Sequence, residues 1–507
     1  MKYFLSIDIG TTNVKVALLN ERGDVIRVIR REVPLYSPEP GAAEHDADEI
    51  VNLVAKASRE LVKGVNEEVT AVCTSSYLFG LLPVSRDGKP LRRLITWMDT
   101  RPERVIGELY REVDVSELYE RTGCPPLPIY QLPKIVWLRE REPDLFQRTA
   151  YFFNIKDYFY FKLTKEAVGD YSSWSGSQLL NMSKLKWDDL ALRLASIGEG
   201  KLPTLMEGLE WIELTDEGAK ILGVRKGTKL VMGVFDGAAV ALGLGCVKEG
   251  IGAVNLGSSA MVRVISDRPV VDKDPSMRFQ TYYLFNRKWL PGGAINNAGL
   301  VLRWFKERLG TLEVLASEIL SENPYAILCK EASKSPPGCR GLMFLPFLVG
   351  ERLPTVGGSW ARACLIGLSY YHSRSDIIRS FMEGVALTLK IIWEALKENG
   401  IEVGELRCAG KGAASELWLR ILADVMNTPI LRSYDLDASN IGNTILAALA
   451  SGEVSDLDEG VSRFVKLRGR IIPSVNGVKI YSKLYRLFKQ VAWDLRDTLK
   501  ELRELPN

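Results

Sequence analysis

Residues 231–262 read VMGVFDGAAVALGLGCVKEGIGAVNLGSSAMV. The apolar run 230–234 predicts a strand that ends before Asp236-Gly237, and the small residues 238–244 predict a helix start. A second predicted strand ends at Gly257-Ser258-Ser259. A carboxylate at a strand end can accept a proton from a hydroxyl, and a Gly-Ser turn can hold a phosphate with its backbone N–H groups. Taken alone, the stretch is explained more simply by a capping Asp and a hairpin turn.

The overall composition restricts the class of protein. A chain of 507 residues is too long for one core, so we expect two domains, over residues 1–245 and 246–507. Its hydrophobic content of 46% and charged content of 25% are typical of a soluble globular protein. A net charge of +3 gives no indication of a nucleic-acid partner or a membrane surface.

The N-terminal run MKYFLSIDIG reads as a first strand rather than a signal peptide, and no apolar run is long enough to span a bilayer. The seven cysteines are scattered and form no CxxC pair, which argues against a disulfide framework or a structural zinc site. With only two histidines, the chain is a poor candidate for a His-rich metal site or a Ser-His-Asp hydrolase. These features together predict a cytoplasmic protein.

A polar hairpin follows the first predicted strand. Residues 2–9, 14–20 and 25–33 predict three strands of a meander, and the same strand–turn pattern returns from residue 231. Gly10 allows a close turn, and Asp8 could hold a hydrated Mg²⁺. The hairpin also offers hydroxyl, amide and ammonium groups at Thr11, Thr12, Asn13 and Lys15. An ordinary polar hairpin tip explains the isolated motif equally well.

Two further clusters suggest ligand binding. The segment TWMDTR ends a predicted strand in Trp97, Asp99 and Arg101, which could contact a polyol or form a surface turn with an ion pair. The predicted strand 406–409 runs into a Gly-rich turn, residues 410–415, that opens a helix. Such a turn lets a nucleotide approach the backbone, although a lone example more often reflects tight packing of a helix on a strand.

Eight motifs in one order resemble the FGGY family of carbohydrate kinases, and they cover nearly the whole chain. They are DIGTTNVK (8–15), PGAAEHD (40–46), TWMDTR (96–101), YQLPKIVWLRE (130–140), DGAA (236–239), NLGSSA (255–260), ACLIGLSYYHSRSDIIRSFMEG (363–384) and AGKGAASELWLRILADV (409–425). Three positions depart from the family pattern. Ser258 stands where Thr is usual, Lys411 where Gly is frequent, and bulky Phe381 where a smaller residue is usual.

The resemblance implies an α/β fold with two actin-like, ribonuclease H-like domains around a cleft for nucleotide and sugar. It implies transfer of the γ-phosphoryl group of ATP to a hydroxyl, with Asp236 as the base and Mg²⁺ near Asp8. Substrate contacts would come from Ser75, Tyr77, Trp97, Asp99, Arg101, Asp236 and Asn296. Cofactor contacts would come from Thr11, Thr12, Asn13, Lys15, Gly257, Ser258, Gly299, Arg303, Gly410, Lys411, Gly412 and Ser415.

The substrate is less clearly indicated. Residues 74–79, TSSYLF, lack the Gly-Gln-Met-His run of xylulokinases and the Arg-Glu pair of glycerol kinases. Residues 292–305 and 345–354 look most like gluconokinase members, so we favour gluconate, with D-xylulose or another ketose or polyol as the alternative. A non-catalytic sugar sensor or an actin-like ATPase is the alternative of another class. A homodimer is compatible with the sequence.

Overall fold

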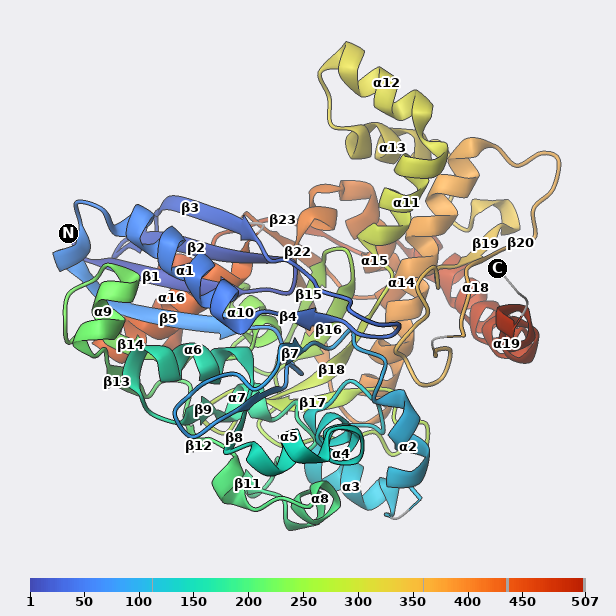
Figure 1. Ribbon diagram of the computed structural model, residues 1–507. Coiled ribbons are helices and arrows are strands. Elements are labelled where there is room, and N and C mark those ends of the chain that lie inside the picture. Colours follow the sequence, from blue (N-terminus) through green and yellow to red (C-terminus); the bar gives the residue numbers. More distant parts are fainter. Residues whose placement is uncertain (112, 359, 435–436, 505–507) are drawn as a thin grey trace.

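The computed structural model describes residues 1–507 except 112, 359, 435–436 and 505–507. Its first sheet is built on the predicted meander and has the strand order β13-β14-β5-β1-β2-β3. β1 pairs antiparallel with β2 and parallel with β5, so the apolar N-terminal strand lies inside the sheet (Figure 1). The strands are β1 (Tyr3–Ile9), β2 (Asn13–Asn20), β3 (Val25–Glu32), β5 (Val69–Ser76), β13 (Trp211–Glu213) and β14 (Lys229–Val231).

The second sheet repeats this pairing pattern in the order β17-β18-β16-β15-β21-β22-β23. β15 pairs antiparallel with β16 and parallel with β21, as β1 does with β2 and β5. The strand predicted from residue 230 is β14 and belongs to the first sheet, so the prediction that the second pattern starts at residue 231 is wrong in its first strand. The repeated pattern begins at β15, where the similarly paired second sheet starts. The strands are β15 (Gly250–Leu256), β16 (Ala260–Val264), β17 (Gln280–Tyr283), β18 (Trp289–Ile295), β21 (Val403–Ala409), β22 (Ile430–Ser433) and β23 (Leu467–Ile471).

Two helices meet where the sheets come together. α10 (Asp236–Gly243) and α16 (Ala438–Ser451) cross so closely that a Cβ on Gly243 would lie 1.8 Å from the carbonyl oxygen of Ala438. α16 comes late in the chain but packs on the first sheet, because Asn443 Nδ2 donates to Ile7 O at 3.0 Å. The sheets divide between residues 231 and 250, around the predicted boundary, yet α16 binds across that division.

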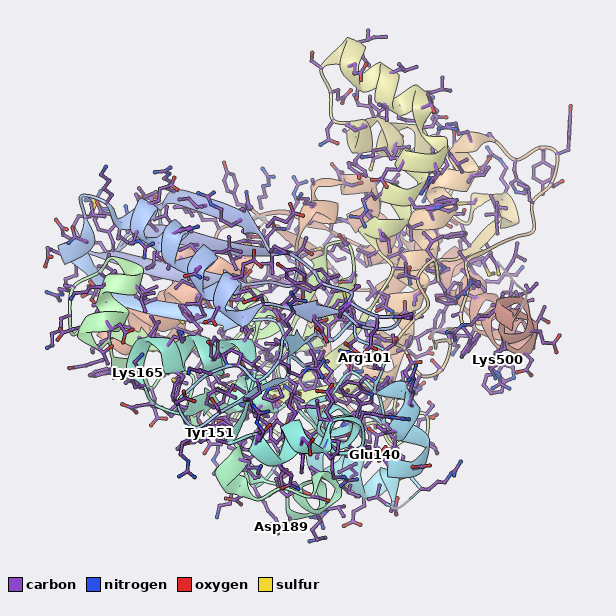
Figure 2. The ribbon with its side chains drawn as sticks, viewed as in Figure 1. Arg101, Glu140, Tyr151, Lys165, Asp189 and Lys500 are labelled. Atoms are coloured by element: carbon purple, nitrogen blue, oxygen red, sulfur yellow. The ribbon has the colours of Figure 1, made fainter. Side chains whose placement is uncertain are left out.

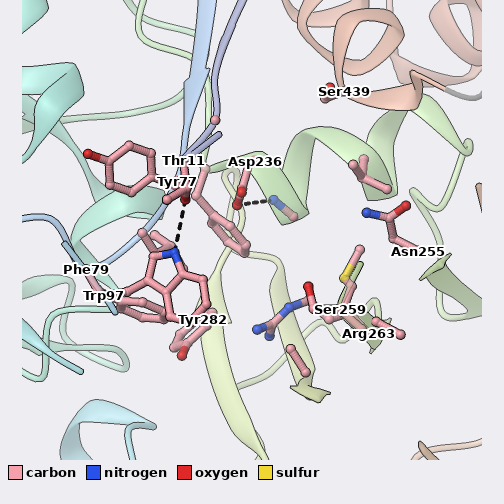
Figure 3. A pocket seen from close by; sticks show the side chains of 18 of the residues that line it. Thr11, Tyr77, Phe79, Trp97, Asp236, Asn255, Ser259, Arg263, Tyr282 and Ser439 are labelled. Atoms are coloured by element: carbon pink, nitrogen blue, oxygen red, sulfur yellow. Dashed lines mark hydrogen bonds between the residues drawn. The ribbon is translucent and has the colours of Figure 1, made fainter. Parts of the chain in front are cut away.

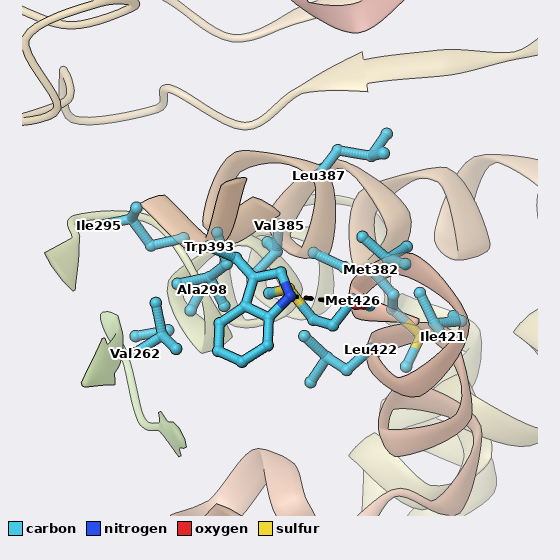
Figure 4. Packing of buried hydrophobic residues seen from close by; sticks show 14 of the residues in the cluster. Val262, Ile295, Ala298, Met382, Val385, Leu387, Trp393, Ile421, Leu422 and Met426 are labelled. Atoms are coloured by element: carbon cyan, nitrogen blue, oxygen red, sulfur yellow. Dashed lines mark hydrogen bonds between the residues drawn. The ribbon is translucent and has the colours of Figure 1, made fainter. Parts of the chain in front are cut away.

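Local capping explains where several helices begin. Asp46 accepts from the backbone N–H of Glu49 at 3.0 Å and caps α1 (Ala47–Val62). Ser373 and Asp376 form a capping box on α14 (Arg374–Glu398). α14 then lies against the second sheet, where Trp393 packs among Val262, Ile295 and Leu422 and donates from Nε1 to Met426 O at 3.1 Å (Figure 4).

The remaining elements connect or cover the two sheets. The helices are α2 (Glu103–Leu109), α3 (Val115–Thr122), α4 (Gln131–Arg141), α5 (Pro143–Arg148), α6 (Ile155–Thr164), α7 (Tyr171–Trp174), α8 (Asp189–Ala195), α9 (Asp216–Leu222), α11 (Gly299–Leu309), α12 (Thr311–Leu320), α13 (Pro324–Ala332), α15 (Glu416–Met426), α17 (Leu457–Phe464), α18 (Val475–Asp494) and α19 (Arg496–Glu504). Short 3-10 helices are η1 (Asn66–Glu68), η2 (Glu199–Lys201), η3 (Cys339–Gly341) and η4 (Lys411–Ala414). Minor strands are β4 (Glu44–His45), β6 (Leu82–Val84), β7 (Leu94–Ile95), β8 (Tyr151–Phe153), β9 (Val168–Asp170), β10 (Leu180–Asn181), β11 (Lys186–Trp187), β12 (Thr204–Met206), β19 (Met343–Leu345) and β20 (Cys364–Ile366).

No helix within the described ranges has both the length and the hydropathy to cross a bilayer. All seven cysteines are free, as their scatter along the sequence predicts.

Candidate active site

A cavity of about 290 Å³ lies where the two sheets and the crossing helices meet, and residues of both sheets line it (Figure 3). Its volume is at the lower end of the range typical of small-molecule sites. The polar and charged lining includes Asp8, Lys15, Asp236, Asn255, Arg263, Gln280, Arg352 and Ser439. The aromatic lining consists of Tyr77, Phe79, Trp97, Phe235 and Tyr282.

Asp236 is the first residue of α10 and faces this cavity. Its Oδ1 accepts a hydrogen bond from the backbone N–H of Gly237 at 2.7 Å, which orients the carboxylate at the helix start. Burial, with a smaller contribution from the negative charge of Asp8, raises the pKa of Asp236 to about 6. A carboxylate with this pKa is ionised at neutral pH and is a better proton acceptor than an ordinary aspartate.

Asp8 lies at the end of β1 and is held from three elements. It accepts hydrogen bonds from Ser75 Oγ at 3.1 Å, from Lys15 Nζ at 3.2 Å and from Ser439 Oγ at 2.8 Å. Ser75, predicted to contact substrate, therefore positions Asp8 instead of lining the cavity.

The donor set suits a weakly coordinated Mg²⁺. The described residues contain no cluster of three His, Cys, Asp or Glu side chains that could enclose a metal. Mg²⁺, however, is usually held by one or two carboxylates together with water and substrate phosphates. Asp8, close enough to raise the pKa of Asp236, fits such a site.

Aromatic side chains form one wall of the cavity. Trp97 Nε1 donates to Thr11 Oγ1 at 3.0 Å, so a residue predicted for substrate and one predicted for phosphate are directly joined. Phe79 has a φ of 72°, an uncommon value for a bulky residue. Its carbonyl accepts a hydrogen bond from buried Lys134, which also donates to Ile129 O at 2.7 Å. Burial lowers the pKa of Lys134 to about 7.

A hydrogen bond to His45 fixes the position of the Tyr77 side chain. Its hydroxyl lies 2.9 Å from His45 Nδ1, and the two rings meet edge to face. Burial lowers the pKa of His45 to about 4, so this buried pair is neutral at physiological pH. The pair gives Tyr77 a fixed position at the cavity wall.

Asp99 and Arg101 lie outside the cavity lining. They form a buried ion pair at 2.6 Å, and Arg101 also pairs with Glu44 at 2.6 Å and stacks on Trp137 (Arg101 is labelled in Figure 2). The ion-pair interpretation of TWMDTR thus describes these two residues, whereas Trp97 alone of the three reaches the cavity. Charged partners on neighbouring segments draw both side chains inward, and the sequence pattern does not reveal them.

Asn296 also acts behind the cavity wall. Its backbone N–H donates to Glu351 Oε1 at 3.0 Å, and its Oδ1 accepts from Arg352 Nε at 2.8 Å. Arg352 lines the cavity, so Asn296 positions a guanidinium there.

Several residues line the cavity that the sequence patterns did not predict, namely Phe79, Asn255, Arg263, Gln280, Tyr282, Arg352 and Ser439. Arg263 left a signal, because a basic residue stands in the apolar strand AMVRV. Arg352 lies in a loop with no local periodicity, and only the fold shows its direction.

The predicted nucleotide residues lie in turns at the carboxyl ends of neighbouring strands in the second sheet. β15 and β21 are parallel neighbours, and Asn255 stands opposite Ala409, so the turns that follow lie side by side. A Cβ on Gly410, whose φ is +88°, would lie 2.5 Å from Leu256 O. Gly299 N donates to Gly257 O at 2.9 Å and brings the start of α11 to the same place. Turns at the carboxyl ends of parallel strands are a common location for nucleotide phosphates.

The other predicted cofactor residues lie around these turns. Lys15 and Thr11 line the cavity, whereas Thr12 and Asn13 occupy the adjoining hairpin tip. Ser415 caps α15 by accepting from Trp418 N at 3.2 Å. The side chains of Ser258, Arg303 and Lys411 are exposed, and Gly412 packs against Leu256.

Comparison with family models resolves the class of protein. The N-terminal domain model of the FGGY family of carbohydrate kinases matches residues 3–243, and the C-terminal domain model matches residues 252–451. The chain belongs to the FGGY family of carbohydrate kinases. The predicted two-domain fold and the predicted ATP-dependent phosphotransferase class are thereby confirmed.

Related proteins carry two different substrate names. Gluconokinase from Bacillus subtilis is 32% identical over 490 residues, covering 96% of this chain and 94% of the relative. Xylulose kinase from the same organism is 29% identical over 514 residues, covering 99% of this chain and all of the relative.

Solved structures show the same division. A gluconate kinase and a ligand-bound xylulose kinase, both from Lactobacillus acidophilus, each superpose with a TM-score of 0.92 at 26% identity. Each match covers 99% of this chain, with 99% of the gluconate kinase and 100% of the xylulose kinase covered. The fold is therefore shared by proteins named for either substrate and does not by itself distinguish between them.

Proposed function

We propose that this FGGY kinase phosphorylates a hydroxyl of D-gluconate, with D-xylulose or another ketose or polyol as the alternative substrate. The observation that carries the proposal is Asp236, a carboxylate with a pKa raised to about 6 at the wall of a sugar-sized cavity. The 32% identity to gluconokinase supports gluconate first. The family match favours the kinase over a non-catalytic sensor or an actin-like ATPase.

Asp236 would act as general base. As the substrate oxygen attacks the γ-phosphorus of ATP, its proton passes to the carboxylate of Asp236. A new oxygen–phosphorus bond forms while the bond from the γ-phosphorus to the bridging oxygen breaks, and ADP leaves with that electron pair. General-base catalysis of this kind typically contributes a factor of about 10² to 10⁴.

The two hairpin turns would hold the phosphates from opposite sides. Thr11, Thr12, Asn13 and Lys15 would supply donors from the first sheet, and Gly257 and Ser258 from the second. Ser258 keeps the hydroxyl of the usual Thr. Mg²⁺ bound near Asp8 would neutralise charge on the phosphates during transfer.

The nucleotide would occupy the edge of the second sheet, beside the turns after β15 and β21. The proposed contacts are Gly299, Arg303, Gly410, Lys411, Gly412 and Ser415. Lys411, which replaces the frequent Gly, is exposed.

The aromatic wall would receive the carbon chain of the sugar. Trp97 and Tyr77 would contact it directly, whereas Ser75, Asp99, Arg101 and Asn296 would position other groups. We further expect the enzyme to work in the cytoplasm.

An ATP-coupled screen tests the proposal. ADP release is measured with a panel of pentoses, hexoses, polyols and aldonates at saturating ATP. We expect the highest kcat/KM with D-gluconate. If no member of the panel raises ADP release above the rate without sugar, the proposed kinase activity is contradicted and the sensor is favoured.

A further inference from the structure

Two arginines face the cavity from the second half of the chain. Arg263 lies on β16 with 5% of its surface exposed, and Arg352 lies in the loop after β19. Arg263 stacks on Tyr282 with its guanidinium carbon 4.5 Å from the ring centre, and Arg352 stacks on Trp97 at 5.1 Å. Both thus approach the aromatic wall where the substrate chain would lie.

The partners of both guanidiniums are neutral. Arg263 Nη1 donates to the carbonyl of Leu290 at 3.0 Å, and Arg352 Nε donates to the amide oxygen of Asn296 at 2.8 Å. Among the described residues, no carboxylate oxygen lies within 4.0 Å of a guanidinium nitrogen of Arg263 or of Arg352. The contrast is Arg101, which is as buried as Arg263 and pairs with Asp99 and Glu44.

The acidic groups nearby are committed elsewhere. Glu351 adjoins Arg352, but its carboxylate accepts from the backbone N–H of Asn296 and of Arg352 itself, at 3.0 Å and 2.8 Å. Asp236 accepts from Gly237 and is required ionised for proton transfer. Burial lowers the pKa of both Arg263 and Arg352. The charges of Asp236 and, for Arg352, of Glu351 offset part of this effect without a direct ion pair. Burial of a charge that has no direct ion-pair partner is costly, so an anionic ligand bound to both guanidiniums would reduce that cost.

We propose that Arg263 and Arg352 form a carboxylate-binding subsite for the acid group of the substrate, while Asp236 receives its reacting hydroxyl. This inference rests on the proposed function. A guanidinium presents parallel N–H groups that match the two oxygens of a carboxylate. Figure 3 shows Arg263 directed toward Tyr282, with Asp236 across the cavity at the start of α10.

The subsite gives a physical reason for choosing an aldonate over a ketose. A neutral sugar that fills the same cavity leaves both guanidiniums without a direct ion-pair partner. A site built for a polar group rejects an analogue that lacks the group, because its own buried partners remain unpaired. Selection therefore comes from the penalty on the neutral substrate as well as from attraction of the acid.

The test compares two ligands of equal chain length. D-Gluconate and D-glucitol differ in one end group, a carboxylate in the first and a hydroxymethyl group in the second. Their dissociation constants are measured by calorimetry without ATP for wild type, Arg352→Gln, Arg352→Lys and Arg263→Gln. Arg148→Gln, which removes an exposed charge on α5, is the matched control. Circular dichroism melts identify any variant that fails to fold.

We expect wild type to bind D-gluconate more tightly than D-glucitol. Arg352→Gln should reduce that preference by a factor of about 10 to 100, the range for a hydrogen bond to a charged group. Arg352→Lys should restore part of it, because the charge returns without the bidentate geometry. Arg148→Gln should leave the preference unchanged. An unchanged preference in folded Arg352→Gln and Arg263→Gln would overturn the subsite.

Turnover measurements distinguish a failure of the proposed carboxylate subsite from a failure of the proposed kinase reaction. If wild type phosphorylates D-xylulose and binds no aldonate, the subsite is wrong and the kinase stands. If Arg352→Gln lowers kcat equally with D-gluconate and D-xylulose and the binding preference is intact, the arginines serve the transferred phosphoryl group, which also overturns the subsite. If no sugar is phosphorylated, the proposed reaction fails, while the binding preference still tests the subsite.

Discussion

The acidic and the guanidinium side chains of the cavity come from different halves of the molecule, while Lys15 of the first half pairs with Asp8. The first sheet and α10 supply Asp8 and Asp236, whereas the second sheet and the loop after β19 supply Arg263 and Arg352. The hairpins that open the two sheets are topologically equivalent, yet Asp8 precedes Gly10 in the first and uncharged Asn255 precedes Gly257 in the second. Two similarly paired sheets can thus divide the work of one site. We assign the chemistry to the acidic side and recognition of the substrate acid group to the basic side.

The largest effect is expected for Asp236→Asn, which removes the carboxylate that we assign as the general base. The amide keeps the size of the side chain but cannot accept the hydroxyl proton. We expect kcat to fall by about 10² to 10⁴, the usual contribution of a general base. Steady-state ADP release measures the loss, and ATP binding, followed by calorimetry, should change little. Unchanged turnover would exclude Asp236 as the base.

The pH dependence of kcat/KM tests the same role of Asp236. Asp236 must be ionised to accept a proton, and its pKa is raised to about 6 by burial and by Asp8. With D-gluconate, kcat/KM should therefore fall about tenfold per pH unit below pH 6 and level off above it. The substrate carboxyl titrates at much lower pH and does not contribute. A flat profile between about pH 5 and pH 8 would contradict this assignment.

Asn296→Asp tests the basic side without removing an arginine. The new carboxylate would lie beside Arg352 Nε, where the Asn296 amide oxygen now accepts at 2.8 Å, and would supply an internal counter-ion. We expect the affinity for D-gluconate to fall by about tenfold, close to the value of one charged hydrogen bond. The affinity for D-glucitol should fall less. An equal loss for the two ligands would indicate general disruption of the loop.

The smallest expected effect concerns the hydrogen bond between Trp97, proposed to contact the sugar, and Thr11, proposed to contact the phosphates. Trp97→Phe removes the hydrogen bond from Nε1 to Thr11 Oγ1 but keeps an aromatic face. A neutral hydrogen bond contributes about 1 kcal/mol, which corresponds to a roughly fivefold decrease in kcat/KM. Thr11→Val removes the other partner, so a double-mutant cycle measures the coupling. Additive effects of the two substitutions would show that the contact does not join the subsites.

Local sequence patterns predicted much of the fold. The strands β1, β2 and β15, the turn at Gly257 and the capped start of α1 follow from alternation, glycine placement and Asp46. Packing over long sequence distances was not accessible. α16 joins the first sheet through contacts such as Asn443 to Ile7, which no local pattern encodes.

The site shows the same limit at the level of single residues. Asp8, Thr11, Lys15, Tyr77, Trp97 and Asp236 were predicted and do line the cavity. Asp99 and Arg101 point into a buried ion-pair network because Glu44 lies beside them in the fold. Arg352 was missed because its loop carries no periodicity, and its role depends on Asn296, a residue 56 positions away in sequence.

Binding of D-gluconate to Asp236→Asn is the most direct test of the division between the two sides. Calorimetry measures the dissociation constant without ATP, and ADP release measures turnover in the same preparation. We expect turnover to fall by a factor of about 10² or more. The affinity for D-gluconate should stay close to that of wild type, because the arginines proposed to bind the acid group are intact. Loss of gluconate binding together with turnover, in a folded variant, would contradict it.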